Sequence, residues 1–291
     1  MAGRLIEIKS FLTGIVAIFA DCRFSIGKLY VETGGESSNE RGLFKKTRGI
    51  IASATVPCYN GGMEKATDRL IILIGEDGAA RLAAAKVAVV GLGGVGGQAA
   101  EAIARSFVGT LVLVDGDRVN KSNANRQILA TAENVGREKA LVAAERARAI
   151  NPNAKVTALP VFVTAENLAE LDIWDADCIV DAIDDVAAKV ALIKEAHRRG
   201  VRIVSSMGAA NRFDPMAFKV ADISETHTCP LAKKLRKLLA AQGIENGVTV
   251  VYSTERPLSF GGALGSNAFV PPAAGLLAAK AAIDMILKEK E

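Results

Sequence analysis

Residues 91–96 form a glycine-rich turn suited to a phosphate group, because they read Gly-Leu-Gly-Gly-Val-Gly between a short apolar run and a predicted helix. In such a strand–turn–helix, Gly91 allows the tight bend, Gly93 lets the backbone approach a ligand and Gly96 permits close packing of the helix on the strand. Gly94 lies inside the same turn, where the N–H groups at the helix N-terminus favour a phosphate. We therefore expect these four glycines to bind a nucleotide.

An acidic residue follows the next predicted strand. Asp115 comes directly after the apolar segment 110–114, where a carboxylate can accept hydrogen bonds from both hydroxyl groups of a ribose. A glycine turn followed by such an acid also fits the fingerprint of NAD-dependent dehydrogenases. The run Ser-Asn-Ala-Asn-Arg-Gln at 122–127 does not belong to that fingerprint. Because this run puts an arginine and side-chain amides where the phosphates of ATP would lie, it favours ATP over a dinucleotide.

Two cations and an amide after Asp115 could bind these phosphates. Arg126 carries a planar guanidinium group with five donors, which suits phosphate oxygens. The ammonium group of Lys139 could reach the same phosphates, and Asn123 could bond either to a phosphate or to the backbone. Taken singly, an arginine or a lysine here is more often a solvated surface charge. Beside the glycine turn and Asp115, we expect both cations to bind phosphate.

A pair of carboxylates follows another buried strand. Asp181 and Asp184 come after the apolar run 178–180, and the carboxyl ends of strands face the crevice in which open α/β sheets bind ligands. We expect Asp184 to hold Mg²⁺ together with water and phosphate oxygens, the usual ligands of that ion. The alternative role of a helix N-cap suits Asp185 better, because the next helix is predicted to begin near Val186.

The elements that must position these residues alternate between strand and helix, which is typical of a mainly parallel sheet covered on both faces. We expect an α/β fold with a doubly wound, Rossmann-like sheet, followed after Asp214-Pro215 by an irregular C-terminal elaboration that ends in an amphipathic helix. The predicted strands are 86–90, 110–114, 155–159, 178–180, 201–204 and 248–252. The predicted helices are one that opens at Gly94 and those at 136–150, 186–199, 227–240 and 271–287.

The first 62 residues differ from the rest of the chain. They include a polar stretch at 34–40 and lack a clear periodic element, whereas Met63 opens a charged helical pattern. We expect residues 1–62 to be a disordered extension or to precede the true start at Met63. The nucleotide-binding domain is then expected to comprise residues 63–291.

The composition narrows the protein class. Half of the 291 residues are hydrophobic and 5% are aromatic, which favours an α/β protein over a β-sandwich. The net charge of +4 says little about a nucleic-acid partner. No apolar run approaches the ~20 residues that span a bilayer, so we expect no membrane association; the run 11–20 is at most the core of a signal peptide. Four scattered cysteines without a Cys-x-x-Cys pair predict reduced thiols in the cytoplasm and no usual zinc site: Cys22, Cys58, Cys178 and Cys229.

Together, these signatures resemble the superfamily of ubiquitin-activating-type adenylating enzymes. Its patterns are Gly-x-Gly-Gly-x-Gly, Asp-x-Asp-x-Val-x-x-Ser/Thr-Asn-x-x-Arg-Gln, a later lysine and Asp-x-x-Asp, and they stand here at 91–96, 115–127, Lys139 and 181–184. Further motifs resemble the branch of tRNA threonylcarbamoyladenosine dehydratases over nearly all of residues 63–291. These motifs are Asn151-Pro152, Gly208-Ala209 with Asp214-Pro215, Pro230-Leu231, 252–255 and 270–275.

The resemblance implies an enzyme that activates a carboxyl group with ATP and Mg²⁺. In that branch, the carboxylate of threonylcarbamoyladenosine next to the tRNA anticodon forms an acyl-adenylate, and the modification then closes into a ring. The resemblance also implies a cytoplasmic homodimer in which Arg69 reaches the ATP phosphates of the other protomer, with a surface arginine as the alternative. The implied catalytic residues are Arg126, Lys139 and Asp184, and the implied nucleotide contacts include Asp115, Asp117, Ser122 and Asn123.

Particular residues distinguish this function from the alternatives. Adenylation of the C-terminus of a ubiquitin-like or sulfur-carrier protein is the main alternative, but the paired zinc cysteines are missing. A non-catalytic nucleotide-binding adaptor is disfavoured by the intact set of charged residues. Cys229 could be a nucleophile or a sulfur relay to a sulfur-transfer protein partner, although no adjacent base would lower its pKa, and Cys178 is predicted to be core. A basic cluster could contact tRNA or form a solvated face: Lys233, Lys234, Arg236 and Lys237.

Overall fold

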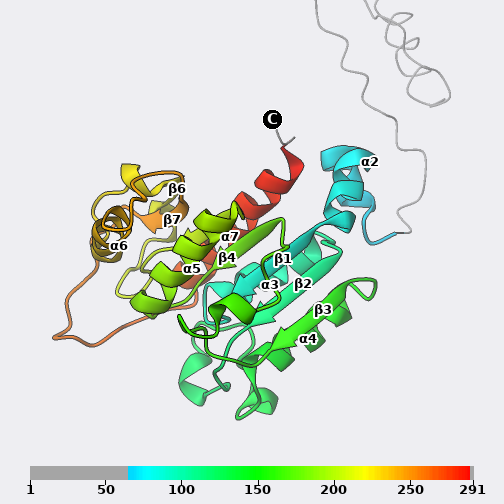
Figure 1. The fold of residues 1–291 in the computed structure, drawn as a ribbon. Helices are drawn as coiled ribbons and strands as arrows, with labels where there is room; N and C mark the ends of the chain where they lie inside the picture. Colours follow the sequence, from blue (N-terminus) through cyan, green and yellow to red (C-terminus); the bar gives the residue numbers. More distant parts are fainter. Residues whose placement is uncertain (1–64, 289–291) are drawn as a thin grey trace, which may run out of the picture. The chain divides into compact units, whose positions relative to one another are not determined.

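The computed structural model describes residues 65–288. Within this range, seven strands form one sheet in the order β3-β2-β1-β4-β5-β7-β6 (Figure 1). Neighbouring strands are parallel, except that β6 and β7 are antiparallel. The bounds are β1 Lys86–Val90, β2 Thr110–Val114, β3 Lys155–Leu159, β4 Cys178–Asp181, β5 Ile203–Ser206, β6 Phe218–Asp222 and β7 Thr249–Ser253. The expected mainly parallel α/β sheet is confirmed, while the predicted extension 1–62 and the start at Met63 lie outside the described residues.

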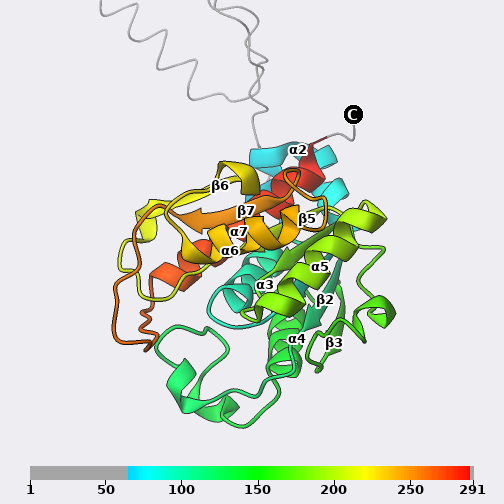
Figure 2. The same cartoon turned by 60° about the vertical axis from the view of Figure 1, so that its left-hand side comes forward.

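Helices cover both faces of this sheet (Figures 1 and 2). Their bounds are α2 Asp68–Ala84, α3 Gly96–Arg105, α4 Lys139–Ile150, α5 Val186–Arg199, α6 Pro230–Ala240 and α7 Val270–Leu287. Because alternate residues of a strand point to opposite faces, Val87 and Val89 of β1 pack with α2, α3, α4 and α7. Ala88 and Val90 pack on the other face with α5 and α6. The central strands are largely apolar because both faces are covered, whereas the edge strand β3 is only partly buried and includes Lys155 and Thr157.

The boundaries differ from the sequence prediction where local turn chemistry intervenes. α4 begins at Lys139 because Gly136 has a positive φ of 89°, and α6 begins at Pro230, since proline suits the first helical position. β6 was not predicted. It is a five-residue strand paired on one side only, and its second and third residues are exposed, so its apolar signal is weak.

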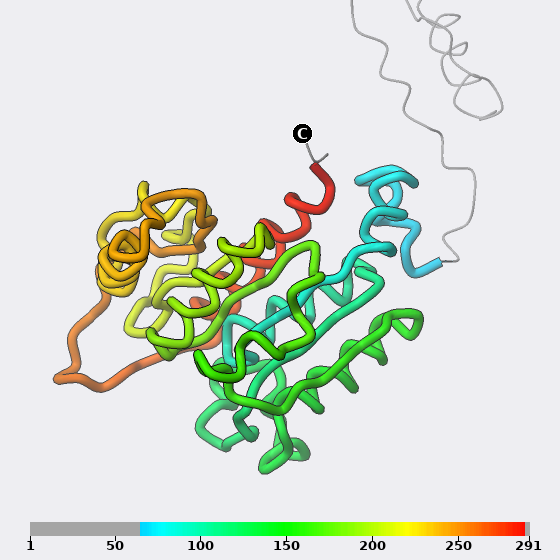
Figure 3. Tube along the Cα trace, viewed as in Figure 1, coloured from blue at the N-terminus to red at the C-terminus, as the bar shows by residue number. Residues whose placement is uncertain are grey.

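The last helix is a core helix and not the amphipathic helix that we expected. α7 has only two charged residues, Lys280 and Asp284, and its mean hydropathy is 1.5 over 18 residues. By length and composition alone it could cross a membrane, so it is a longer apolar run than the sequence analysis recognised. Half of this helix is buried, and it packs against α3 and the sheet. A helix that is apolar almost all round fits such a buried position. The connection from β7 to α7 extends away from the sheet (orange in Figure 3).

A buried ion pair joins three neighbouring elements below the crevice. The Nζ atom of Lys189 in α5 lies 2.7 Å from Oδ2 of Asp181 at the end of β4, and both side chains are fully buried. The hydroxyl group of Ser205 in β5 donates to the same oxygen at 2.6 Å, and the N–H of Ile183 donates to Oδ1 at 3.0 Å. Asp181 therefore serves to hold β4, β5 and α5 together, and its carboxylate is not open to a ligand.

Replacing Lys189 by methionine should strongly destabilise the fold, because it leaves the carboxylate of Asp181 buried without a counter-charge. We expect the free energy of unfolding, measured by urea denaturation, to fall by about 3–5 kcal/mol. Lys194→Met changes an exposed lysine of the same helix and should alter that free energy by less than about 0.5 kcal/mol. Equal stability of Lys189→Met and the wild type would show that the ion pair does not hold these elements.

Candidate functional site

The glycine turn after β1 is packed so tightly that two of its positions exclude any side chain. Gly91 has a φ of +87°, and a Cβ atom there would lie 2.7 Å from the carbonyl oxygen of Ala182. At Gly96, the first residue of α3, a Cβ atom would lie 1.7 Å from the carbonyl oxygen of Gly91. The turn is therefore pressed against the β4–α5 connection on one side and against its own helix on the other.

The other two glycines differ in their surroundings. A Cβ atom on Gly94 would lie 2.9 Å from Cβ of Pro271 in α7 and 3.3 Å from the carbonyl oxygen of Arg126. A Cβ atom on Gly93 would meet only Nε2 of Gln127, at 3.8 Å. The turn thus has an open flank at Gly93, bordered by Arg126 and Gln127, beside the N-terminus of α3, where backbone N–H groups favour an anion.

Asp115 ties the end of β2 to this turn. Its Oδ2 accepts a hydrogen bond from the N–H of Leu92 at 2.6 Å, and its Oδ1 accepts one from the N–H of Asp117 at 2.7 Å. Burial raises the pKa of Asp115 above its ordinary value, while these two hydrogen bonds and the nearby Lys139 ammonium act in the opposite direction. Each carboxylate oxygen can accept more than one hydrogen bond, so the anchored carboxylate can still accept one from a ribose.

Lys139 lies in the same cluster of charges. Its Nζ atom is 2.8 Å from Oδ2 of Asp117, and its backbone N–H donates to the carbonyl oxygen of Asp117 at 3.0 Å. The lysine side chain is almost fully buried, whereas the side chain of Asp117 is about half exposed. The lysine that was predicted to bind phosphate is therefore near Asp115, as expected, but its charge is already balanced by an aspartate.

The segment 120–127 forms a 3₁₀ turn that presents Arg126. Nη1 of Arg126 donates to the carbonyl oxygen of Ser122 at 3.0 Å and to Oδ1 of Asn125 at 2.9 Å. Oδ1 of Asn123 accepts from the N–H of Asn120 at 3.0 Å, so the backbone role considered for Asn123 is the one seen here. The hydroxyl group of Ser122 donates to Asn120 Oδ1 at 3.1 Å. Ser122 and Asn123 thus shape the turn, and Arg126 packs beside Gly94 through its carbonyl oxygen and Cγ atom.

Asp184 is exposed in the connection after β4, two residues beyond the Ala182 carbonyl group that packs against Gly91. Among the described residues, its carboxylate has no hydrogen-bond or ion-pair partner. Asp185 caps α5 by accepting from the N–H of Ala188 at 2.8 Å, as predicted. Residues 65–288 contain no group of three or more histidine, cysteine, aspartate or glutamate side chains that could hold a metal ion. A single exposed carboxylate fits Mg²⁺ only if phosphate and water supply the other ligands.

Arg69 lies far from the glycine turn of its own chain. It is exposed near the start of α2, which Figures 1 and 2 show at the amino ends of the strands. Arg81 of α2 donates to the carbonyl oxygen of Leu287 at the end of α7, while Pro271 at the start of α7 contacts Gly94. At about 1.5 Å per residue, α7 separates these two contacts by about 24 Å.

Two cysteines and the basic cluster have defined surroundings. Cys178 is buried, as predicted, and burial raises the pKa of its thiol to about 12. Cys229 is also buried, at the N-cap of α6.

In the basic cluster of α6, Arg236 donates to the carbonyl oxygen of Thr226 at 2.6 Å, which makes it a structural residue. The three lysines of the cluster are exposed: Lys233, Lys234 and Lys237.

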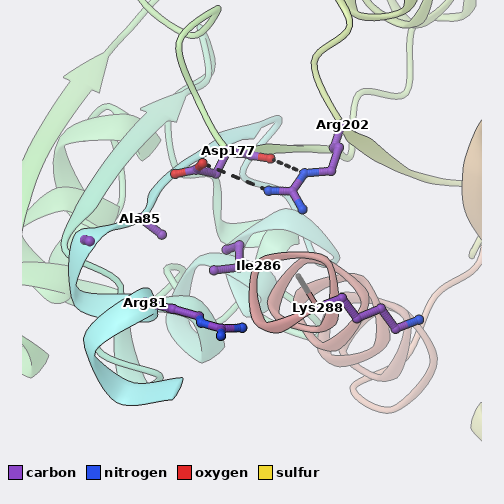
Figure 4. Close-up of a pocket in the computed structure, with 7 residues that line it drawn as sticks. Arg81, Ala85, Asp177, Arg202, Ile286 and Lys288 are labelled. Carbon is purple, nitrogen blue, oxygen red and sulfur yellow. Dashed lines mark hydrogen bonds and ion pairs between the residues drawn. The ribbon is translucent and has the colours of Figure 1, made fainter. Parts of the chain in front are cut away.

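A cavity of about 420 Å³ lies at the opposite end of the strands, between α2 and the end of α7. Figure 4 shows Arg202 turned toward Asp177 above Ile286, with Arg81 and Lys288 at the rim. Because these residues stand at the amino ends of the strands, the cavity is separate from the glycine turn and from the predicted site residues.

Sequence reasoning missed one buried cation near the site. Arg212 follows β5 and lies between two motifs that were noticed, Gly208-Ala209 and Asp214-Pro215, but it was not singled out. Its backbone carbonyl group accepts a hydrogen bond from Asn267 at 3.0 Å, and the neighbouring Ser266 carbonyl group accepts one from Asn125 at 3.1 Å. These contacts bring the segment before α7 to the residues around Arg126, although they are far apart in sequence.

Alanine substitution is expected to affect different properties at the two kinds of glycine: ligand binding at the open position and stability at the closely packed one. Gly93→Ala should leave the unfolding temperature unchanged but weaken ATP binding about tenfold, about 1.4 kcal/mol, because the new methyl group occupies the open flank. Gly96→Ala should lower the free energy of unfolding by about 3 kcal/mol, because its Cβ atom meets a backbone carbonyl oxygen. Isothermal titration calorimetry and thermal unfolding measure the two effects. Wild-type affinity for ATP in Gly93→Ala would show that the nucleotide does not approach at this residue.

Comparison with known proteins identifies the family of this chain. The model of the ThiF family matches residues 67–291. A tRNA threonylcarbamoyladenosine dehydratase from Bacillus subtilis is 40% identical over 238 residues, which cover 76% of this chain and 94% of the relative. The crystal structure of the Escherichia coli tRNA N6-threonylcarbamoyladenosine dehydratase in complex with ATP superposes with a TM-score of 0.71 at 39% identity, over 74% of this chain and 91% of that one.

More distant structures share only the fold. The Escherichia coli protein MccB, in complex with succinimide, is 18% identical and has a TM-score of 0.54 over 77% of this chain and 64% of that one. The family model and the high coverage of the Bacillus relative decide the assignment. This chain belongs to the ThiF family and, within it, to the tRNA threonylcarbamoyladenosine dehydratases.

Proposed function

We propose that this chain catalyses the ATP-dependent dehydration of threonylcarbamoyladenosine in tRNA, next to the anticodon, through an acyl-adenylate. The observation that carries the proposal is a set of contacts around the glycine turn: Asp115 accepts from the N–H of Leu92, the Lys139 ammonium acts on the same carboxyl group, and Arg126 packs beside Gly94. The relatives support the same activity, since the dehydratase from Bacillus subtilis aligns over 94% of its length and the Escherichia coli dehydratase was solved with ATP and with AMP.

The reaction consists of two displacements. A carboxylate oxygen of the threonyl group attacks the α-phosphorus of ATP, and the bond to pyrophosphate breaks. The carbamoyl group then attacks the activated carbonyl carbon, the bond to AMP breaks and a proton is released, which leaves a five-membered ring. The net loss is one water molecule, whose oxygen leaves with AMP. Because the nucleophiles belong to the substrate, the protein has to bind, orient and stabilise charge.

Each residue of the site has a role in this scheme. The backbone at Gly93 and the N-terminus of α3 bind phosphate oxygens, and Asp115 accepts hydrogen bonds from the ribose. Arg126 and Lys139 stabilise the charge that develops on the phosphates, which is the largest catalytic effect available to such a site. For Lys139 this requires that its pairing with Asp117 loosens when the nucleotide binds.

We include Mg²⁺ in the proposal, with Asp184 as its protein ligand. The exposed carboxylate, which has no partner within residues 65–288 and follows the Ala182 carbonyl group packed on Gly91, supports this assignment. The ion would neutralise phosphate charge and orient the pyrophosphate leaving group.

We further propose a homodimer in which Arg69 of one protomer completes the site of the other. Two observations support this arrangement. Arg69 belongs to α2, at the amino ends of the strands, and therefore lies too far away to reach the glycine turn of its own chain. Ile72 and Leu73, in the same part of α2, are 55% and 81% exposed. Exposed large apolar side chains of this kind suit a protein interface.

The tRNA substrate requires a basic surface and access to ATP. The exposed lysines of α6 supply positive charge, so we propose that this helix contacts the tRNA backbone.

Both substrates occur in the cytoplasm, which is where we place the enzyme. A sulfur-transfer protein partner is not part of the proposal, because the thiol of Cys229 that it would have to reach is buried.

The activity is tested with ATP, Mg²⁺ and tRNA that contains threonylcarbamoyladenosine, followed by mass spectrometry of the nucleosides. We expect the modified nucleoside to lose the mass of one water molecule. Arg126→Ala and Asp184→Ala should each lower the turnover number by about 100-fold or more without a change in the unfolding temperature. Asp185→Ala is the matched control, which should lose about 1 kcal/mol of stability with its N-cap but keep turnover. ATP binding without loss of water would refute the proposed reaction.

Subunit mixing tests the shared site. Arg69→Ala and Arg126→Ala homodimers should each be inactive, but a mixed dimer contains one site with both arginines. After equal mixing and exchange, half of the dimers are mixed and half of their sites are intact, so activity should recover to about one quarter of the wild type. If Arg69 acted within its own chain or were only a surface residue, mixing would restore nothing beyond the activity of the separate variants.

A further inference from the structure

Arg212 is a buried cation without a counter-ion in the described part of the chain. Its side chain and backbone together are only 4% exposed. Nη1 donates to the carbonyl oxygen of Gly208 at 2.5 Å and of Ala210 at 3.3 Å, and Nε donates to that of Glu255 at 3.2 Å. All of these acceptors are neutral, and no carboxylate among the described residues pairs with the guanidinium group. Burial of a charge is costly unless an opposite charge accompanies it.

One nitrogen atom of this guanidinium group has no partner among residues 65–288. Nη2 of Arg212 is buried and makes no hydrogen bond there. The nearest acidic residue in this network is Glu255, and its carboxylate accepts instead from the N–H groups of Phe213 and Asp214, each at 3.0 Å. A buried donor without an acceptor requires a specific explanation. An anionic ligand bound at Nη2 would account for both the unpaired charge and the unpaired atom.

The position of Arg212 connects it to the nucleotide site. It follows the carboxyl end of β5, and the side chain of Asn267 links its carbonyl group to the first N–H groups of α7. The start of α7 contacts Gly94, and Ser266 is bonded to Asn125 next to Arg126. Within the described part of the chain, the buried side-chain atoms without a partner all belong to residues of this region: Gln127 Oε1, Arg212 Nη2 and Ser266 Oγ.

We propose that Nη2 of Arg212 binds the threonyl carboxylate of the substrate and presents it to the α-phosphate of ATP. This inference rests on the proposed function, because it takes its ligand from that reaction. Arginine is the cation best suited to a carboxylate. Since Nε and Nη1 already donate to carbonyl groups, Nη2 can hold one carboxylate oxygen and leave the other free to attack phosphorus.

The same arrangement makes Arg212 selective for a small anion. Nη2 is enclosed, so a phosphate of the tRNA backbone cannot approach it as it can approach an exposed lysine. We expect the carboxylate to reach this atom when the connection between β7 and α7 is displaced. That connection is hydrogen-bonded to Asn211 at two points. The carbonyl oxygen of Asn211 accepts from the N–H of Leu258 at 2.7 Å, and its Nδ2 atom donates to the carbonyl oxygen of Ala263 at 3.1 Å. Gly261 and Gly262, with φ of +61° and +92°, lie at its exposed bend.

The test compares two RNA ligands that differ only in the proposed contact. One is an anticodon stem-loop with threonylcarbamoyladenosine, and the other carries the carboxamide in place of the carboxylate. Binding is measured by fluorescence anisotropy with the full chain and a non-hydrolysable ATP analogue. We expect the wild type to bind the carboxylate at least about tenfold more tightly, which corresponds to about 1.4 kcal/mol. Arg212→Met should bind both RNAs equally, with the wild-type affinity for the carboxamide and for the ATP analogue.

Controls separate this contact from a structural role. Arg256→Met removes an exposed arginine nearby and should keep the wild-type preference, while Arg212→Lys should keep part of it. A preference that persists in Arg212→Met would overturn the proposal, as would an equal loss of affinity for both RNAs and for the ATP analogue. If Arg212→Met does not fold, Arg212→Lys decides in its place, because an undiminished preference for the carboxylate in that variant, or no preference in the wild type, contradicts the proposal. Failure of the wild type to dehydrate the tRNA would instead refute the proposed function.

Discussion

The close approach of backbone to backbone at the glycine turn is the constraint on which the rest of the structure depends. Gly96 lies against the carbonyl oxygen of Gly91, and Gly91 lies against that of Ala182, at separations that leave no room for a Cβ atom. The turn therefore connects β1, the β4–α5 connection and α3 without intervening side chains. α7 joins the same point, because a Cβ atom on Gly275 would lie 2.3 Å from the carbonyl oxygen of Val95. Four elements meet here because glycine is present at each contact.

The charged residues around this turn differ in how their charges are balanced. Lys189 and Asp181 neutralise each other in the core and stabilise the sheet. Lys139 pairs with the half-exposed Asp117, so a stronger anion can compete for it. Within residues 65–288, Arg126 donates to neutral oxygens, and Arg212 is buried among carbonyl groups with one nitrogen unpaired. The more completely a cation is neutralised by its neighbours, the more structural is its role. Lys189 is therefore structural, whereas Arg126 and Arg212 are available for a ligand.

Much of the fold was predictable because its signals are local. Most of the buried parallel strands contain short apolar runs, and the glycine turn and the N-cap at Asp185 depend on neighbouring residues. The exceptions have physical causes. β6 was missed because its apolar pattern is weak. α7 was predicted to be amphipathic, but it is apolar almost all round, and tertiary packing covers much of that surface. The predicted extension 1–62 lies outside the described residues and stays a prediction.

The sequence by itself determined the glycine turn, the acid that follows it and the family, since these depend on residue types at short spacings. Only the tertiary structure decided what individual charges do. Asp181 and Asp184 look alike in sequence, yet Lys189 and Ser205 enclose the first while the second is exposed. Arg212 resembles any polar loop residue until the fold buries it beside the start of α7. The reason is that the energy of a charge depends on the neighbours that replace its water, and those neighbours come from distant parts of the chain.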